Sequence, residues 1–575
     1  MRQAAIVTFL LATLVTWPTL VQPTSAVLGH PGNDVWNHIW GYWWVWEKLR
    51  HFELPLETNL MHFPDVSRLF FIDTFGAVIT LPVQWVLGPV AAVNAIMFSC
   101  FWAAGFSAWL LGRQVLETLR GPGAVTDRLA LVVAIAYAAS PHLIAQAYNG
   151  ITETLFAAGL PFSTYATLRF LERPTLRRGV TAGLTGALCV LANWYFGLFA
   201  VVGAVSLLAT HAWARRDRVH WRAIPVAAGV GTLVALVLVA PVLLGFSSTL
   251  DGANAIVQRD PKFVWESLIN HNMTDVVSLF HPGRFYSPDL KALTGEDLLI
   301  VTYLGWSLIA FALIGALTLR QPDRVHWVVW VVVFLVLALG PQLYVDGNYV
   351  TIDDRKVKLP FLLLYESIPA FQRISHPFRF VMGAQLGLGL LAVGGLARRP
   401  QWTHALAGAL ILAESLVASP APWPIARSQA TMPAYVSTLR EDPVEGAVLD
   451  LPINVPNLER AVYLYYQTAH GRPSPYSLNE PLPPILERSH LARVILVAEG
   501  GQLDTLPPSL GTLDLVVAGR SAARLGVRYI VVHEHMYPPE RLDQVLTLLR
   551  TALGEASFDT GEGERVWRLD SPEAQ

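Results

Sequence analysis

The chain has 575 residues, of which 53% are hydrophobic and 15% are charged, and its formal net charge is −2. A soluble domain cannot bury so large an apolar fraction, so the composition indicates a membrane protein. The nearly neutral charge gives no reason to expect a nucleic-acid partner. Cys100 and Cys189 both lie in apolar runs and do not indicate a disulfide framework.

Residues 4–21 form the first apolar segment. We expect an uncleaved helix with a cytoplasmic N-terminus rather than a cleaved signal peptide, because many more apolar segments follow. Further segments are long enough to cross about 30 Å of hydrocarbon. They lie near residues 93–111, 129–146, 153–171, 223–246, 298–318, 326–345, 379–397 and 402–420.

Two regions are apolar but interrupted. Residues 75–92 contain Pro82 and Gly88-Pro89, and residues 179–209 contain Asn193-Trp194-Tyr195-Phe196-Gly197. The positive-inside rule is satisfied if 75–92 does not cross and 179–209 is a hairpin of two short helices with its tip outside. If instead 75–92 crosses the membrane and 179–209 is a single span, only residues 112–178 move to the other side of the membrane. The arginines that become cytoplasmic when 75–92 does not cross and 179–209 is a hairpin are Arg113, Arg120, Arg128, Arg173, Arg177, Arg178, Arg215, Arg216, Arg218, Arg222, Arg320, Arg324, Arg398 and Arg399.

The predicted fold class is an α-helical polytopic membrane protein with about 11 to 13 transmembrane helices and a small C-terminal extracytoplasmic α/β domain. The transmembrane domain covers residues 1–420, with a first outer loop at 22–74 and further outer loops at 247–297 and 346–378. Residues 421–575 form the second domain. In it, AVLDLPI, VRYIVVHE and ERVWRL are typical of strands and DQVLTLLRTAL of a helix.

The first outer loop opens with Gly29 and Asp34, and five tryptophans follow within residues 36–46. The tryptophans are typical of an interfacial belt on an amphipathic helix, and Asp34 can be the cap of that helix. A carboxylate directly after the first span would also face a substrate that arrives from the bilayer. There it can act as a general base on an acceptor hydroxyl.

This organisation resembles the GT-C superfamily of polytopic glycosyltransferases and, more narrowly, the bacterial YfhO-like membrane proteins. The shared features are the first span, the outer loop with Asp34 before an aromatic helix, Phe63-Pro64-Asp65 leading back to the membrane, many further spans and a C-terminal outer domain. The resemblance implies that Asp34 is the catalytic base and that the donor is a sugar on a polyprenyl phosphate. It also implies inverting transfer at the outer face of a bacterial plasma membrane.

Many GT-C members carry two neighbouring acids in this loop, as DxD, ExD or DE, whereas Asn33 and Val35 flank Asp34. A hard divalent cation would need several oxygen ligands, and Asp65, Asp73 and Glu153 would have to converge to supply them. We therefore assign no metal ligands and no cofactor, and a divalent metal stays an open alternative.

A leaving phosphate needs cations, and arginine suits it because the guanidinium gives paired, charge-assisted hydrogen bonds. Arg373, His376 and Arg379 lie immediately before a span on the outer side. They can bind the donor phosphate, or they can be interfacial anchors that attract anionic lipid.

Three further places can contribute to substrate binding. Glu153 begins an apolar span and is either a functional acid or a helix cap. In the 193–197 interruption, Asn193 can bind a sugar hydroxyl and Trp194 or Tyr195 can stack on a sugar, although aromatic residues are ordinary at an interface. His281-Pro282-Gly283-Arg284 can reach the site or form a solvated turn.

Two motifs lie in the C-terminal segment. Residues 465–473 carry aromatic, amide and basic groups, as a carbohydrate-binding surface or a structural loop would. His533 and His535 alternate along a predicted strand and face one side, as a metal pair would, but no further ligands accompany them.

The sequence therefore predicts a membrane glycosyltransferase that acts on a lipid-linked sugar donor, with a glycan, lipid or protein acceptor and membrane lipid as its partners. The first alternative is a transporter or flippase of lipid-linked sugars, which would place polar residues deep within its spans. The second is a non-enzymatic scaffold in cell-envelope assembly.

Overall fold

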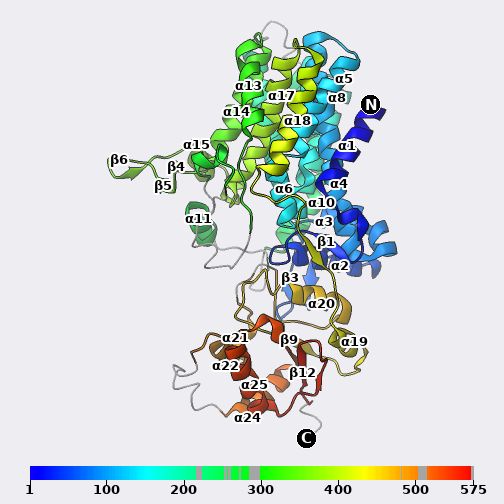
Figure 1. Ribbon diagram of the computed structural model, residues 1–575, viewed down its shortest axis with the longest axis vertical. Coiled ribbons are helices and arrows are strands. Elements are labelled where there is room, and N and C mark those ends of the chain that lie inside the picture. Colours follow the sequence, from blue (N-terminus) through cyan, green and yellow to red (C-terminus); the bar gives the residue numbers. More distant parts are fainter. Residues whose placement is uncertain are drawn as a thin grey trace.

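The computed structural model describes residues 1–214, 223–250, 255–256, 261–270, 274–283, 298–478, 480, 482–502 and 514–570. A bundle of helices forms one end of the molecule and a small mixed sheet lies near the other (Figure 1). Arg215, Arg216, Arg218, Arg222 and Arg284 lie outside the described residues, as does much of the predicted outer loop 247–297.

The centre of the bundle is α17 (Val381–Leu396), whose residues are all buried. Its sequence is apolar on every face, which is typical of a helix surrounded by other helices. It packs against α4, α5, α13 and α14. The bundle consists of α1 (Arg2–Val15), α4 (Leu81–Arg120), α5 (Ala124–Ala138), α6 (Pro141–Tyr148), α7 (Gly159–Glu172), α8 (Leu176–Ala192), α9 (Trp194–Ala214), α10 (Ala223–Ser248), α13 (Trp306–Thr318), α14 (Asp323–Ala338), α17 and α18 (Gln401–Val417).

Four helical stretches among the described residues are long and apolar enough to cross a membrane: 81–120, 194–213, 223–248 and 377–396. The bent pair of α5 and α6, which differ in direction by 43°, makes up to five. Shorter apolar helices, such as α1 and α13, lie beside them (Figure 1). The apolar helices make this an integral membrane protein. The predicted span at 298–318 is helical only from Trp306 onward, because Gly305 adopts a positive φ of 87° and starts the helix there.

Both predicted interruptions are present. Residues 75–92 hold α3 (Thr74–Ile79) and the start of α4, which bends at Gly88 where φ is 83° and ψ is 175°. No single straight helix covers this region, as expected from Pro82 and Pro89. The second region divides into α8 and α9 at Asn193, whose backbone is extended.

Helices α8 and α10 approach each other through small residues. A Cβ atom on Gly183 would lie 2.0 Å from the carbonyl oxygen of Gly231, and one on Gly179 would lie 2.1 Å from that of Ala227. Each helix thus presents two small residues four positions apart, which is the spacing that lets membrane helices pack backbone to backbone.

Gly183→Ala is expected to lower the apparent melting temperature of the purified protein in lipid nanodiscs by several degrees. The added methyl group must push the two backbones apart, and overpacking of this kind costs about 1–3 kcal/mol. Gly186→Ala is the matched control on the same helix, because a Cβ atom there meets nothing within 4 Å. Equal melting temperatures for the two variants would contradict this packing.

The C-terminal sheet has the strand order β11-β12-β10-β9, with β9 (Ala447–Leu451) parallel to β10 (Val527–His533) and β12 (Glu564–Arg568) antiparallel to it. The edge strand is β11 (Phe558–Asp559), and α25 (Pro539–Leu553) lies between β10 and β11 along the chain. The three predicted strands and the predicted helix are therefore confirmed. The other helices here are α19 (Ala434–Glu441), α20 (Val462–His470), α21 (Ile485–Arg488), α22 (His490–Glu499) and α24 (Leu515–Leu525).

The C-terminal segment packs directly on residues 22–74, which were predicted to be the first outer loop (Figure 1). Strand β1 (Ala26–Leu28) pairs antiparallel with β8 (Arg427–Gln429). Farther along the loop, β2 (Glu57–Thr58) pairs with β3 (Ser67–Arg68), and His62 Nε2 lies 2.5 Å from Glu480 Oε2. The same loop carries α2 (Val35–Arg50), which packs on α20.

The tryptophans of α2 show why these two helices stay together. Trp36 stacks on Tyr465 with ring centroids 4.9 Å apart, and Trp40 Nε1 donates a 2.7 Å hydrogen bond to Gln467 Oε1. Trp40 and Trp44 are fully buried and stack on each other. The predicted interfacial belt is therefore wrong for these three residues, because protein covers them. Helical spacing reveals an apolar face but does not reveal what covers it.

Candidate functional site

Asp34 is the first residue of the site and lies at the N-terminus of α2. Its side chain makes no capping hydrogen bond to the helix, so the interpretation of Asp34 as a cap is wrong. Instead, Asn37 Nδ2 donates a 2.6 Å hydrogen bond to Asp34 Oδ1, and Asp34 Oδ2 lies 3.7 Å from His38 Nε2. The Asp34 side chain keeps 17% of its surface exposed, which leaves it within reach of a ligand.

The turn at Asn149-Gly150 brings a second acid to α2. Asp34 N donates to the carbonyl oxygen of Asn149, and a Cβ atom on Gly150 would lie 2.8 Å from Val35 Cα. Gly150 also has a positive φ of 74°, so glycine suits both the turn and the close approach. Glu153 follows in a short 3-10 helix, η2 (Thr152–Thr154), and faces the same histidine as Asp34.

His38 lies between the two acids and is 4% exposed. Its Nε2 atom is 3.3 Å from Glu153 Oε2 and 3.7 Å from Asp34 Oδ2. On the other side of the ring, Nδ1 is 2.7 Å from Thr152 Oγ1, and the Thr152 hydroxyl donates to Asp73 Oδ2. The site therefore joins α2, η2 and the residue that precedes α3.

Asp73 is fully buried and completes this chain of contacts. It caps α3 by accepting from Gly76 N, and the hydroxyl of Tyr42 donates a 2.6 Å hydrogen bond to its Oδ2. Burial raises the pKa of Asp73 to about 6, although the nearby charge of His38 and the two hydroxyl donors oppose the rise.

Electrostatics favour the charged form of His38. Burial alone would lower its pKa, but the hydrogen bond to Asp34 and the negative charges of Glu153, Asp34 and Asp73 outweigh burial and raise it to about 9. Burial raises the pKa of Glu153, and the charges of His38 and Arg379 oppose that rise. At neutral pH, a positive imidazolium thus lies beside the two acids.

The predicted phosphate-binding stretch approaches Glu153 through Arg379, which lies in η6 (Pro377–Phe380), directly before α17. Arg379 is 8% exposed, and its guanidinium carbon is 4.8 Å from the ring centroid of Tyr195. The Tyr195 hydroxyl accepts a 3.2 Å hydrogen bond from His376 N. Asn193 Nδ2 donates to the carbonyl oxygen of Glu153, and Asn193 Oδ1 accepts from Tyr195 N.

Contacts thus connect Glu153, Asn193, Tyr195, Arg379 and the backbone of His376, and Glu153 shares the His38 ring with Asp34. Asn193 uses its amide to hold the Glu153 segment against α9. Within the part of the chain that the structure describes, Glu153 Oε2 and Arg379 Nε are buried without a hydrogen-bond partner. Glu153 Oε2 is an acceptor that faces His38 Nε2 at 3.3 Å, and Arg379 Nε is a cationic donor, so each can form a hydrogen bond with a polar ligand.

Two of the predicted binding residues, Arg373 and Trp194, have surroundings that differ from those of Arg379. Arg373 is exposed, and its guanidinium carbon lies 5.7 Å from the ring centroid of Phe246 rather than beside Glu153. Trp194 is half-buried against Tyr195, with ring centroids 4.2 Å apart.

Of the three acids considered as metal ligands beside Asp34, Asp73 and Glu153 lie around His38, whereas Asp65 does not. Asp65 forms an ion pair with Arg488 Nη2 at 2.7 Å, away from Asp34. Among the described residues, no group of three or more His, Cys, Asp or Glu side chains is arranged to hold a metal ion. His38 occupies the position between Asp34 and Glu153, so these residues do not fit a metal bound between them.

The C-terminal motifs are part of the packing. Tyr465 and Gln467 contact the first outer loop or α2, and the Arg472 guanidinium donates to the carbonyl oxygens of Leu439, Asp442 and Val444. Residues 465–473, which are the end of α20 and the three residues after it, therefore have a structural role. His533 Nε2 lies 2.9 Å from Asp450 Oδ1 in a fully buried pair, which accounts for the histidine without a metal.

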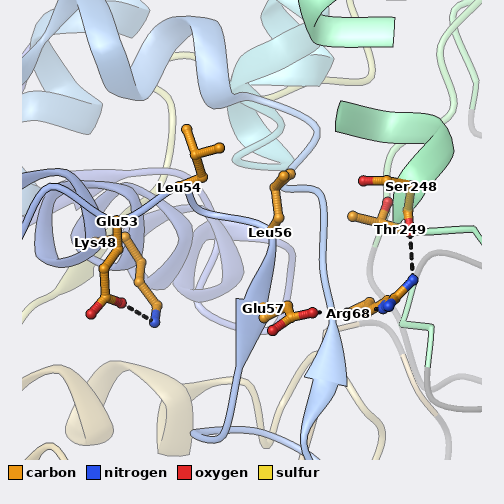
Figure 2. Close-up of a pocket in the computed structure, with 8 residues that line it drawn as sticks. All are labelled: Lys48, Glu53, Leu54, Leu56, Glu57, Arg68, Ser248 and Thr249. Atoms are coloured by element: carbon orange, nitrogen blue, oxygen red, sulfur yellow. Dashed lines mark hydrogen bonds and ion pairs between the residues drawn. The ribbon is translucent and has the colours of Figure 1, made fainter. Parts of the chain in front are cut away.

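A separate pocket of about 430 Å³ lies at the opposite end of α2 (Figure 2). It is lined by Lys48, Glu53, Leu54, Leu56, Glu57, Arg68, Ser248 and Thr249. Lys48 pairs with Glu53 at 2.7 Å, and Arg68 Nη1 donates to the carbonyl oxygen of Ser248. Lys48 is fourteen positions after Asp34, which corresponds to about 20 Å along a helix, so this pocket does not include the Asp34 site.

Sequence reasoning missed His38 and Thr152 as partners of Asp34 and Glu153, and it considered Asp73 only as a possible metal ligand. His38 could have been found, because it lies four positions after Asp34 and side chains at this spacing meet on a helix. Thr152 and Asp73 join through tertiary contacts that leave no local pattern.

No family model matches the chain, and no curated protein matches it. Solved structures do match. The arabinofuranosyltransferase AftD from Mycobacteria aligns over 100% of this chain and 40% of its own, with 13% identity and a TM-score of 0.53. This chain thus spans about two fifths of AftD.

Two structures of an Archaeoglobus fulgidus oligosaccharyltransferase also match. AglB in complex with an inhibitory peptide and a dolichol-phosphate aligns over 96% of this chain and 71% of its own, with 11% identity and a TM-score of 0.53. The complex with Zn and sulfate aligns over 96% and 70%, with 12% identity and a TM-score of 0.50. The chain therefore has a GT-C-like fold.

Proposed function

We propose that this protein is a membrane glycosyltransferase of the inverting type, which transfers one sugar from a polyprenyl-phosphate donor to an acceptor. The observation that carries the proposal is the meeting of Asp34, Glu153 and Arg379 in one polar site of a GT-C-like fold. The dolichol-phosphate in the AglB complex supports a lipid phosphate as the leaving group.

In the proposed reaction, Asp34 takes the proton of the acceptor hydroxyl. The acceptor oxygen bonds to the anomeric carbon from the face opposite the phosphate. The bond from that carbon to the phosphate oxygen breaks, and its electron pair leaves with the polyprenyl phosphate. Asp34 suits the role of base because it is more exposed than Glu153, whose side chain is 7% exposed.

Arg379 and Glu153 have complementary roles in this proposal. The guanidinium of Arg379 binds the leaving phosphate and stabilises the charge that grows on it. The Oε2 atom of Glu153, which also faces the His38 imidazolium, accepts a hydrogen bond from a donor-sugar hydroxyl. Tyr195 holds Arg379 through its ring, and Trp194 offers a partly exposed ring face to the sugar.

The site lies at the end of the bundle that meets the C-terminal segment (Figure 1). We place this end outside the membrane, with the N-terminus in the cytoplasm, about 11 to 13 spans and residues 421–575 as an extracytoplasmic domain of a bacterial plasma-membrane protein. The narrower grouping with the YfhO-like proteins belongs to this proposal as well.

The test is a panel of polyprenyl-phosphate sugars given to the purified protein in lipid nanodiscs. We expect one donor to be transferred, or slowly hydrolysed to free sugar and polyprenyl phosphate, with inversion at the anomeric carbon seen by NMR. Empty nanodiscs are the control. Movement of intact donor between leaflets without cleavage would favour the transporter alternative, and binding without cleavage or movement would favour the scaffold.

A further inference from the structure

We propose that protonated His38 is the resident cation between Asp34 and Glu153 and takes the place that a divalent metal ion would occupy there. The assignment deepens the proposed site. Any role of this imidazolium in catalysis rests on the proposed function, whereas the identity of the cation does not. A structurally similar archaeal oligosaccharyltransferase was solved in complex with Zn and sulfate, so we compare His38 with a metal ion as the cation of this site.

The first argument is position. The same nitrogen, Nε2, lies 3.7 Å from Asp34 Oδ2 and 3.3 Å from Glu153 Oε2. A hard divalent cation binds oxygen at about 2.0–2.6 Å and requires six or more ligands. With the imidazole between them, these two carboxylates cannot close around a metal without moving the ring. The ring is held on its other side by the contact of Nδ1 with Thr152 Oγ1.

The second argument is the proton count on the ring. The Thr152 hydroxyl donates its single proton to Asp73, so Thr152 Oγ1 accepts from His38 Nδ1, which must carry a hydrogen. Nε2 faces two carboxylates, which accept hydrogen bonds, so it too carries a hydrogen. The contacts on both sides of the ring therefore specify the doubly protonated form.

The third argument is charge balance in a buried space. His38, Glu153 and Asp73 each have less than one tenth of their surface exposed. The charged groups facing His38 are Asp34 on its own helix, Glu153 from η2 and Asp73 before α3, while Arg379 faces Glu153 from η6. Three acids around one position require a cation, and the imidazolium supplies it from within the chain.

The raised pKa of His38 determines the pH range in which the ring is charged. Its pKa of about 9 lies above the ordinary value of 6.5, so the ring stays charged through neutral pH and loses its proton as the pH rises through about 9. The stabilisation that the ring gains from the acids is fully present below pH 6.5 and is lost over the same rise.

Two measurements on the wild-type protein in nanodiscs test the proposal without requiring turnover. The first is Mn²⁺ binding followed by electron paramagnetic resonance. We expect no saturable Mn²⁺ that depends on Asp34 and Glu153. One bound Mn²⁺ per chain that is lost in both Asp34→Asn and Glu153→Gln would overturn the proposal. Mn²⁺ that persists in both variants lies elsewhere and leaves this site metal-free, as proposed.

The second measurement is the ¹⁵N NMR signal of labelled histidine, assigned with His38→Gln. We expect His38 to have hydrogens on both nitrogens at pH 8, and a neutral ring at that pH would overturn the proposal. His51, exposed near the other end of α2, is the internal reference. If a donor is turned over, the rate should also resist EDTA. Absence of turnover would count against the proposed function, while the Mn²⁺ and NMR results still decide the identity of the cation.

Discussion

Asp34→Asn is expected to lower kcat for sugar transfer by at least about 100-fold, as the loss of a general base does. The substitution keeps the size of the side chain and its ability to accept a hydrogen bond from Asn37, but it removes the proton acceptor. Binding of the donor should change little, because Asp34 acts on the acceptor. The measurement is single-turnover transfer with the donor identified from the panel.

Asp65→Asn is the matched control for that substitution. Asp65 belongs to the same outer loop and pairs with Arg488 at the surface, away from Asp34. Exposed pairs contribute about 0–1 kcal/mol to stability, so this variant should fold and turn over like the wild type. Equal rates for Asp34→Asn and wild type would show that Asp34 positions α2 rather than takes a proton.

Arg379→Gln is expected to reduce kcat/KM for the donor by about 10- to 100-fold, because a charge-assisted hydrogen bond to phosphate contributes about 1.5–3 kcal/mol. Free polyprenyl phosphate should also bind more weakly to the variant, which isothermal titration would detect without turnover. The glutamine keeps a polar donor beside Tyr195 and removes the charge.

Arg373→Gln controls for a general effect of positive charge at the membrane surface. Arg373 is six positions earlier in the same stretch, but it is exposed and lies beside Phe246. Its loss should change kcat/KM by less than about twofold, since exposed charges are well screened. If both arginine variants lose the same activity, the two residues attract anionic lipid and do not bind a specific phosphate.

Local patterns predicted much of the fold. β-branched runs identified β9, β10 and β12, and the polar interruption at Asn193 identified the break between α8 and α9. These features depend on neighbouring residues, which a sequence displays directly. Helix ends were less accurate, as at 298–318, where a single glycine conformation decides where the helix starts.

Part of the candidate site was predictable because its residues lie beside the ends of predicted spans. Asp34, Glu153 and Arg379 were all assigned to the outer side, and the structure brings them to one place. The sequence could not separate Arg379 from Arg373, because their different burial arises from how the chain turns before α17. It also could not reveal that the turn at Gly150 presses against α2 and delivers Glu153 to His38.

The contact between α2 and α20 has a consequence for biosynthesis. The loop that carries Asp34 is made early, but Tyr465 and Gln467, which cover its tryptophans, are made more than 400 residues later. Until those residues have been made and folded, Trp36 and Trp40 lack their partners Tyr465 and Gln467. The loop that carries Asp34 therefore gains this support only after residue 467 has been made, and a chain that stalls before residue 465 holds α2 without it.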